Sequence, residues 1–320
     1  MRAVVRDRYG SADVLELTEI EKPGLEADRV LVRVRATSVN PADWYAMSGL
    51  PYLARPTVGL RRPRSRLLGT DYAGTVEAVG SDVTDFAPGD EVFGARTGAF
   101  AEYVDASSIA HKPAGLSFDE AAAVPVAALT ALQGLRDKGR VQPGEHVLIN
   151  GASGGVGTFA VQIAKALGAN VTGVCSTGNV DRARELGADH VVDYTTDDFT
   201  TTGKRYDVIL DVAGSRSWSD CKRVLDPGGR LVVVGAAKGG RTAGPLGHIA
   251  KLWLGGLASR RKVVFFIAKF DQSDLTTLCE LLESGAVKPV IDRRYQLSEI
   301  GDALRYLGEG HARGKVVVTI

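Results

Sequence analysis

The segment from Gly144 to Gly157 constrains the fold most, because a buried-strand run there passes into a glycine-rich turn and then a helix. The strand is expected over Val147 to Ile149, and Gly168 is expected to end the helix. An α/β unit of this kind packs one apolar helix face on a sheet. The residues with that spacing are Val156, Phe159, Ala160, Ile163, Ala164 and Leu167.

The turn has the spacing of a dinucleotide-binding fingerprint, with Ala152, Gly154 and Gly157 at its small-residue positions. Small residues allow a tight turn and close approach of the backbone to phosphate, and the helix N-terminus supplies N–H groups and positive dipole for an anion. A glycine turn without a ligand is the alternative. The predicted contacts are Ala152, Ser153, Gly154, Gly155, Val156 and Gly157.

Length and composition narrow the class of protein. At 320 residues the chain suggests two domains, and a net charge of +1 with scattered signs argues against nucleic acid or anionic membrane as a partner. Cys175, Cys221 and Cys279 have no metal-ligand or disulfide-framework spacing, so a reducing cytoplasm is expected. No apolar stretch has the length of a signal core or a bilayer span, so we expect a soluble, unprocessed protein.

The pattern of apolar residues changes along the chain. Residues 1–118 read as a β-rich domain, with Val30, Val32, Val34 and Ala36 alternating against arginines. Residues 119–268 alternate apolar runs with helical segments, which predicts a doubly wound, six-stranded parallel sheet. Residues 269–320 contain two helices and a closing strand, Lys315–Ile320, expected to return to the first domain. The six runs are His146–Asn150, Val171–Cys175, His190–Asp193, Asp207–Val212, Arg230–Gly235 and Val263–Ala268.

Two segments are expected to be long loops, Gly49–Leu68 and Gly239–Ser259. The first contains five arginines, which form either a solvated surface or a lid that gathers an anionic group.

Several motifs occur together in order: Asn40-Pro-Ala-Asp-Trp44, the segment from Gly69 to Val76, Gly89-Asp-Glu-Val-Phe-Gly94 and the glycine turn. With Gly144-Glu145, Gln162 and Lys165 in addition, the chain resembles the zinc-free quinone oxidoreductase (zeta-crystallin) branch of the medium-chain dehydrogenase/reductase superfamily. The resemblance implies a GroES-like catalytic domain, a Rossmann cofactor domain with the active site in the cleft between them, and a homodimer. The run Val263–Ala268 is then either an inner strand or an edge paired with its copy, and the family favours the edge.

Zinc ligands of the metal-dependent relatives are missing. No cysteine precedes Cys175, and the Gly-His-Glu pattern of those enzymes reads Gly69-Thr70-Asp71 here. The five histidines are scattered singly. We therefore expect no metal and a hydride chemistry that needs no Lewis acid.

Coenzyme choice depends on the end of the second sheet strand, where NAD enzymes place Asp or Glu. The chain has Ser176, Thr177 and Asn179 there, with Arg182 close in sequence, which can hydrogen-bond a 2′-phosphate. NADP(H) is the predicted cofactor. The resemblance adds contacts from Tyr194, whose alternative is packing on the sheet, and from Val212, Gly235, Phe266, His311 and Arg313.

The predicted reaction passes hydride from NADPH to a quinone or an α,β-unsaturated carbonyl. The Asn40 amide and the Tyr45 hydroxyl are the candidate catalytic donors to the substrate oxygen. For Asn40, the alternative is that it satisfies buried backbone groups before Pro41. Two rival functions stay open: a NADPH-binding redox-responsive or structural protein with little turnover, and an NADP-dependent alcohol dehydrogenase.

Overall fold

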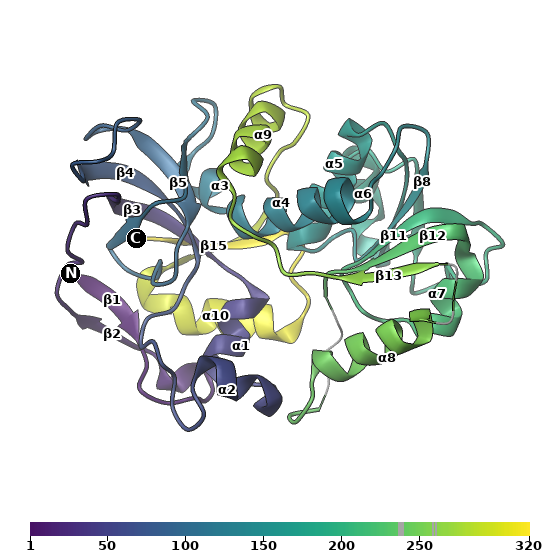
Figure 1. Ribbon diagram of the computed structural model, residues 1–320, viewed down its shortest axis with the longest axis horizontal. Helices are drawn as coiled ribbons and strands as arrows, with labels where there is room; N and C mark the ends of the chain where they lie inside the picture. Colours follow the sequence, from purple (N-terminus) through teal and green to yellow (C-terminus); the bar gives the residue numbers. More distant parts are fainter. Residues whose placement is uncertain (236–239, 258, 260) are drawn as a thin grey trace. The chain divides into compact units, whose positions relative to one another are not determined.

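The structure is a computed structural model that describes residues 1–235, 240–257, 259 and 261–320. These residues form two compact units, each described separately below. The first comprises Met1–Leu129, Phe270–Gly285 and Pro289–Ile320, and the second comprises Thr130–Lys269 and Ala286–Lys288. Figure 1 gives the element labels.

The first unit is built on a seven-stranded sheet in the order β14-β15-β3-β4-β5-β7, with β6 also paired to β3. β3 carries the expected alternation: Val30, Val32 and Val34 are buried and Arg33 is exposed. The closing strand β15 pairs antiparallel with β3 inside this sheet, so the tail does return to the first unit. The strands of the unit are β1 (Arg2–Val5), β2 (Glu16–Glu19), β3 (Val30–Val39), β4 (Asp71–Val79), β5 (Glu91–Ala95), β6 (Tyr103–Ala106), β7 (Ile109–His111), β14 (Ile291–Gln296) and β15 (Lys315–Thr319).

Helices of the first unit connect and cover these strands. The division from the second unit falls after Leu129 instead of after residue 118, because α3 packs against β3 and β4. The expected loop Gly49–Leu68 contains two short helical turns, η2 and α2. The helices are η1 (Ala12–Val14), α1 (Pro41–Ser48), η2 (Tyr52–Ala54), α2 (Arg55–Val58), α3 (Phe118–Ala122), α9 (Gln272–Glu283), η5 (Leu297–Glu299) and α10 (Ile300–Glu309), with α4 (Pro125–Leu132) starting here.

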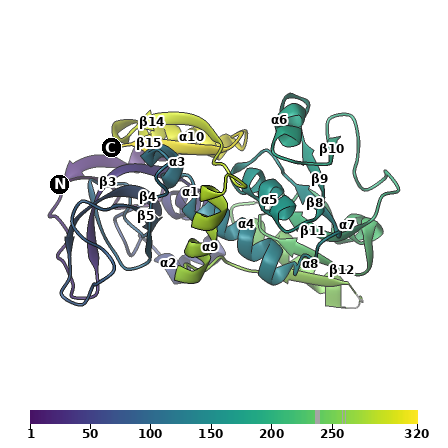
Figure 2. The same cartoon turned by 90° about the horizontal axis from the view of Figure 1, so that it is seen from above.

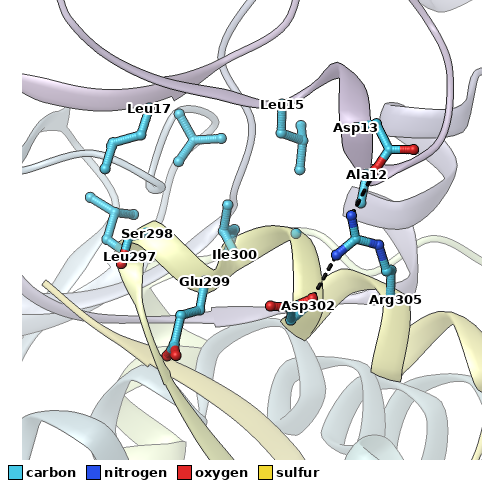
Figure 3. Close-up of a pocket in the computed structure, with 12 residues that line it drawn as sticks. Ala12, Asp13, Leu15, Leu17, Leu297, Ser298, Glu299, Ile300, Asp302 and Arg305 are labelled. Atoms are coloured by element: carbon cyan, nitrogen blue, oxygen red, sulfur yellow. Dashed lines mark hydrogen bonds and ion pairs between the residues drawn. The ribbon is translucent and has the colours of Figure 1, made fainter.

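A pocket of about 250 Å³ lies between η1, β2 and the start of α10 (Figure 3). Leu15, Leu297 and Ile300 are among its apolar lining residues. Arg305 joins Asp13 on one side and Asp302 on the other, so one guanidinium bridges two carboxylates. The pocket is thus bounded by an ion-pair network that ties η1 to α10.

The second unit contains the predicted six-stranded parallel sheet, in the order β10-β9-β8-β11-β12-β13. Figures 1 and 2 show α5 and α6 on one face and α7 and α8 on the other, as in a doubly wound fold. The strands are β8 (His146–Asn150), β9 (Asn170–Cys175), β10 (His190–Asp193), β11 (Tyr206–Asp211), β12 (Leu225–Val233) and β13 (Lys262–Phe265), and the helices are η3 (Gln133–Lys138), α5 (Gly155–Ala166), η4 (Thr177–Asn179), α6 (Val180–Glu185), α7 (Trp218–Val224) and α8 (Pro245–Leu257).

Two predictions for this unit need correction. The segment Gly239–Ser259 is not a loop where the structure describes it, because Pro245–Leu257 form α8, which packs on α7 and β13; residues 239 and 258 lie outside the described residues. The last strand ends at Phe265 instead of Ala268 and lies at the edge of the sheet, so it is not an inner strand. No described helix is long and apolar enough to span a membrane.

Candidate active site

The glycine turn lies where the strand order of the parallel sheet reverses. β8 stands between β9 and β11, and ligands of open α/β sheets bind outside the carboxyl ends of the strands at such a switch point. Gly151 has φ +96°, and the Gly151 and Ala152 N–H groups both donate to the Val174 carbonyl oxygen, which fixes the turn on β9. The turn is therefore a rigid continuation of the sheet.

The turn has small residues at three positions, Ala152, Gly154 and Gly157, and the structural reason for a small residue differs between them. A Cβ on Gly157 would lie 2.0 Å from the Gly151 carbonyl oxygen, so this glycine permits close packing of the helix on the turn. A Cβ on Gly154 would meet only that oxygen, at 3.7 Å, so the protein itself does not require glycine there. Ala152 is fully buried. Room beside Gly154 is what a ligand approaching the backbone needs.

The N-terminus of α5 carries no side-chain cap. Gly154 is its N-cap residue, and it has no side chain that could accept from the first-turn N–H groups. These groups have no carbonyl partner within a helix, so they suit the oxygen atoms of a phosphate. Ser153, Gly155 and Val156 are partly exposed beside them. The residues present fit a dinucleotide pyrophosphate.

The residues predicted to bind the 2′-phosphate, and so to distinguish NADPH from NADH, lie where β9 and β10 end. Ser176 is partly exposed, Thr177 and Arg182 are exposed, and Tyr194 is 58% exposed, so its ring does not pack on the sheet. Asn179 differs from the prediction: it is buried, and its Nδ2 donates to Ser176 Oγ at 2.9 Å. The Asn179 amide therefore orients Ser176 instead of pointing outward.

Sequence reasoning missed one carboxylate at this edge. Asp193 ends β10 opposite Cys175, the last residue of β9. Its Oδ1 accepts from both the N–H and the hydroxyl of Thr195, and Thr195 Oγ1 lies 2.9 Å from Thr177 Oγ1. Hydrogen bonds from Thr177 and Thr195 hold the pKa of Asp193 below its usual range, so a negative charge stands beside the predicted phosphate contacts. The parallel pairing of β9 and β10, invisible in the local motif, brings it there.

A buried carboxyl lies at the switch point itself. Asp211 Oδ1 accepts from Asn150 Nδ2 at 2.7 Å and from the Gly214 N–H at 2.9 Å, and Asn150 Nδ2 also donates to Ser215 Oγ at 3.2 Å. Burial raises the pKa of Asp211. Next to it, Val212 and Gly235 meet closely: a Cβ on Gly235 would lie 2.1 Å from the Val212 carbonyl oxygen. The turn after β11 and the turn after β12 are thus in direct backbone contact.

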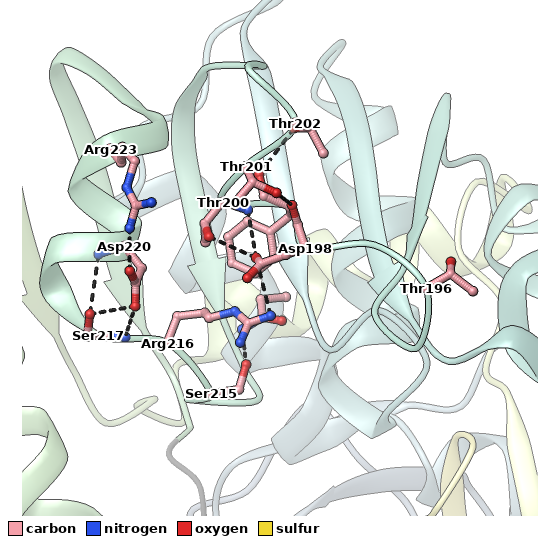
Figure 4. A network of polar contacts seen from close by, with 12 residues as sticks. Thr196, Asp198, Thr200, Thr201, Thr202, Ser215, Arg216, Ser217, Asp220 and Arg223 are labelled. Atoms are coloured by element: carbon pink, nitrogen blue, oxygen red, sulfur yellow. Dashed lines mark hydrogen bonds and ion pairs between the residues drawn. The ribbon is translucent and has the colours of Figure 1, made fainter.

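A second polar network joins the loop after β10 to the segment that follows β11 (Figure 4). Asp198 accepts from the N–H and hydroxyl of Thr200 and pairs with Arg216 at 3.2 Å. Asp220 accepts from Ser217 and Arg223. Together they fix the segment that carries Ser215.

Phe266 follows β13 in the second unit, where its ring borders Gly134 and lies beneath the Lys138 ammonium. Gln133 holds the same segment by two hydrogen bonds to the backbone of Lys269. His311 and Arg313 belong to the first unit and are exposed, and the Arg313 N–H donates to Asp292 Oδ2.

In the first unit, Asn40 belongs to a buried cluster of charged and polar side chains. Asn40 Oδ1 accepts from Lys315 Nζ at 2.7 Å, and Asn40 Nδ2 donates to Asp71 Oδ2 at 3.0 Å. Lys315 Nζ lies 3.0 Å from the same Asp71 oxygen, which also accepts from Ser38 Oγ. The Asn40 side chain thus binds the Lys315 and Asp71 side chains, and it also stands at the N-cap of α1, in a capping box with Asp43.

Asp43 adjoins this cluster at the start of α1. Its carboxylate accepts from the Asn40 N–H and from the Thr70 hydroxyl. Burial raises the pKa of Asp43 to about 7, with the charge of Asp71 adding to the effect and hydrogen bonding to Asn40 opposing it. Tyr45, one turn along α1, is half-buried, and its pKa is raised by burial, so its phenol stays protonated at neutral pH.

The arginines of the segment 49–68 are largely engaged with nearby groups. Arg55 stacks on Tyr9 and Tyr52, and Arg66 pairs with Asp7. Arg61 and Arg62 are exposed. This arrangement agrees with a solvated surface, and the anion-gathering lid stays a prediction.

The chain matches two family models, described as the alcohol dehydrogenase GroES-like domain (residues 26–134) and as zinc-binding dehydrogenase (residues 186–318). It is 34% identical to a chloroplastic quinone oxidoreductase of Triphysaria versicolor, over 99% of this chain and 98% of the relative. The chain belongs to the quinone oxidoreductase branch of the medium-chain dehydrogenase/reductase superfamily.

Other relatives agree with this membership. A mitochondrial NAD(P)H oxidoreductase of Mus musculus is 36% identical, over 100% of this chain and 89% of the relative. The solved quinone oxidoreductase of Coxiella burnetii has a TM-score of 0.87 at 31% identity, covering 100% and 99% of the two chains. That of Escherichia coli, solved with NADPH, has a TM-score of 0.84 at 27% identity, covering all of both chains. The GroES-like and Rossmann folds, an oxidoreductase activity and a nicotinamide cofactor are thereby confirmed for this branch member.

The zinc named in one family description does not suit the donor groups present. In Gly69-Thr70-Asp71 the Thr70 hydroxyl donates to Asp43, and the Asp71 carboxylate is held by the Lys315 ammonium. Zinc needs thiolate, imidazole or free carboxylate ligands. Across residues 1–235, 240–257, 259 and 261–320, no group of three or more His, Cys, Asp or Glu side chains is arranged to hold a metal ion.

Proposed function

We propose that this oxidoreductase is a zinc-independent, NADPH-dependent reductase of quinones or α,β-unsaturated carbonyl compounds. The observation that carries the proposal is the uncapped N-terminus of α5 beside Gly154, at the switch point of the sheet. The named activities of its relatives support the substrate class.

The bound coenzyme would supply a hydride. A quinone that accepts this hydride and one proton becomes a hydroquinone, and NADPH becomes NADP⁺, so atoms and electrons balance. The developing charge on the substrate oxygen requires hydrogen-bond donors, and the Asn40 amide and the Tyr45 hydroxyl have that chemistry. The protonated phenol of Tyr45 or water delivers the final proton.

Preference for NADPH rests on the hydroxyls of Ser176 and Thr177 and on the lack of a carboxylate directly after β9. The negative charge of Asp193 opposes this preference, and a substitution of Asp193 measures by how much. We expect a higher kcat/KM with NADPH than with NADH.

The decisive experiment places a charge in the space beside Gly154. Gly154→Asp is expected to fold normally, because its backbone (φ −79°, ψ 175°) suits any residue, and to weaken NADPH binding at least roughly tenfold through repulsion of the pyrophosphate. The measurement is fluorescence titration with NADPH, followed by coenzyme oxidation with a panel of quinones and enones.

Gly24→Asp is the matched control, since Gly24 is exposed and a Cβ there would meet nothing within 4 Å. Unchanged NADPH affinity in Gly154→Asp would contradict the coenzyme site. Tight NADPH binding without turnover of any acceptor would favour the binding-protein alternative, and NADP⁺ reduction by alcohols would favour the alcohol dehydrogenase.

A further inference from the structure

Three neighbouring strands bring Lys315, Asn40 and Asp71 together. β15 pairs with β3 so that Val316 lies opposite Val39, and continuing this register by one residue places Lys315 opposite Asn40. β3 pairs with β4 so that Ser38 lies opposite Asp71. The cluster is thus fixed by sheet register and not by flexible loops.

All three side chains are removed from solvent. Lys315 and Asn40 are each 3% exposed, and Asp71 is fully buried. A buried ion pair is costly unless its remaining donors and acceptors are satisfied. Here Asp71 Oδ1 accepts from the Val126 N–H and Oδ2 accepts from Ser38, Asn40 and Lys315. Such a fully bonded carboxylate is a rigid support.

The chemistry of the two partners leaves one orientation for the Asn40 amide. A lysine ammonium only donates, so it must face the Asn40 oxygen, and an ionised carboxylate only accepts, so it must face the Asn40 nitrogen. Asp71 takes one of the two N–H groups of Nδ2. In the part of the chain that the structure describes, no acceptor is recorded for the second N–H group.

We propose that Lys315 is a positioning residue for the reaction, which fixes the Asn40 amide so that the second N–H group of Nδ2 is directed at the substrate oxygen. The ammonium 2.7 Å from the Asn40 oxygen also polarises the amide, so the opposite N–H groups become stronger donors. A donor held in place before the reaction stabilises negative charge without reorganisation. The inference rests on the proposed reductase function, because it needs an acceptor whose oxygen becomes negative.

The test replaces Lys315 by methionine, which keeps the unbranched shape of the side chain, without its terminal ammonium group, and so removes its charge. Lys315→Met is expected to lower kcat for quinones by roughly 10- to 100-fold, less than the roughly 100- to 1000-fold cost of removing a preorganised donor outright, because the Asn40 amide is still present. The NADPH dissociation constant should stay within about twofold, since removal of a positioning group affects the transition state most. Lys112→Met is the control: Lys112 is also buried and ion-paired in the first unit but lies outside the cluster.

A series of substituted benzoquinones separates positioning from a merely structural role. Electron-poor quinones need little stabilisation of the product oxygen, so the Lys315→Met loss should be smallest for chlorinated and largest for methoxylated members. An equal loss for all members, or none, would overturn the proposal. A wild-type protein that binds NADPH but reduces no quinone or enone would overturn the reductase function and this inference together.

A spectroscopic readout does not depend on turnover. The chain has four asparagines, so ¹⁵N-labelled asparagine gives a simple side-chain spectrum in which Asn40→Asp assigns the Asn40 resonances. Lys315→Met should shift the Nδ2 protons of Asn40, whereas Lys112→Met should not. Lys315→Arg, which keeps the charge, should restore part of both the shift and kcat. Absence of any shift in Lys315→Met would contradict the polarised amide.

Discussion

At the scale of single residues, the candidate site depends on how polar side chains are satisfied once they are buried. Asn40 was identifiable as a candidate from its motif, but Lys315 and Asp71 were not. They are separated by 244 positions in the sequence, and their ion pair exists only because β15, β3 and β4 are neighbours. Asn179 shows the same limit: its amide is predictable, but its inward direction depends on the turn after β9.

Asp43 gives a prediction at this scale for the pH dependence of stability. Its folded pKa of about 7 lies above the ordinary value of 3.8, so its contribution to stability is greatest below about pH 4 and is lost as the pH rises to 7. In Asp43→Asn this loss should be absent, and the difference in unfolding free energy between pH 4 and pH 8 should change by a few kcal/mol.

Urea denaturation at several pH values measures this. Asp85→Asn, at an exposed position, should leave the wild-type profile unchanged. Parallel profiles for wild type and Asp43→Asn would show that the buried carboxyl is not the titrating group.

At the scale of elements, strands were predicted far better than the segments between them. The six runs of the parallel sheet could be identified because buried strands are continuous apolar runs, and their order follows the doubly wound pattern. α8 was missed because it begins at Pro245 and contains Gly247, Gly255 and Gly256, residues that favour loops. η2 and α2 were missed because Pro51 and Pro56 lie at their starts. Neighbouring strand ends also place side chains together that no linear motif connects, as with Asp193 and Thr177.

The pairing of β9 with β10 leads to a prediction on coenzyme choice. Asp193→Asn removes a negative charge from the edge that carries Ser176 and Thr177, so the ratio of kcat/KM for NADPH to that for NADH should rise roughly three- to tenfold. Steady-state kinetics at low ionic strength measures the ratio.

Raising the salt concentration should shrink the effect, because Thr177 is exposed and Ser176 and Asp193 are partly exposed. Asp197→Asn, in the following loop, is the control. A fall in the ratio would place the 2′-phosphate elsewhere or show that the Asp193–Thr195 contacts maintain the edge.

At the scale of the whole molecule, both units were foreseen, but their boundary was not, since the apolar helix α4 suits either sheet by composition.

The sequence also predicts that two copies of the chain associate. β13 is an edge strand, and Phe265 and Ile267 are 41% and 80% exposed, an arrangement that suits pairing with a second copy.

We expect light scattering to give about twice the chain mass of 33.9 kDa. Ile267→Asp should shift the molecule toward the single-chain mass, whereas Leu53→Asp, at another exposed apolar residue, should not. A wild-type protein with the mass of one chain at micromolar concentration would contradict this prediction.

The discontinuous first unit has a consequence for synthesis on the ribosome. Asp71 emerges early, but its cation partner follows 244 residues later, after the entire parallel sheet has been translated. Until then the part of β3 that pairs with β15, Ala36–Val39, has no partner on that edge in the nascent chain, and a carboxylate that will be buried keeps its hydration. The second unit is nearly continuous in the chain and can fold first, whereas the unit that holds Asn40 is completed only when the C-terminal strands have been made.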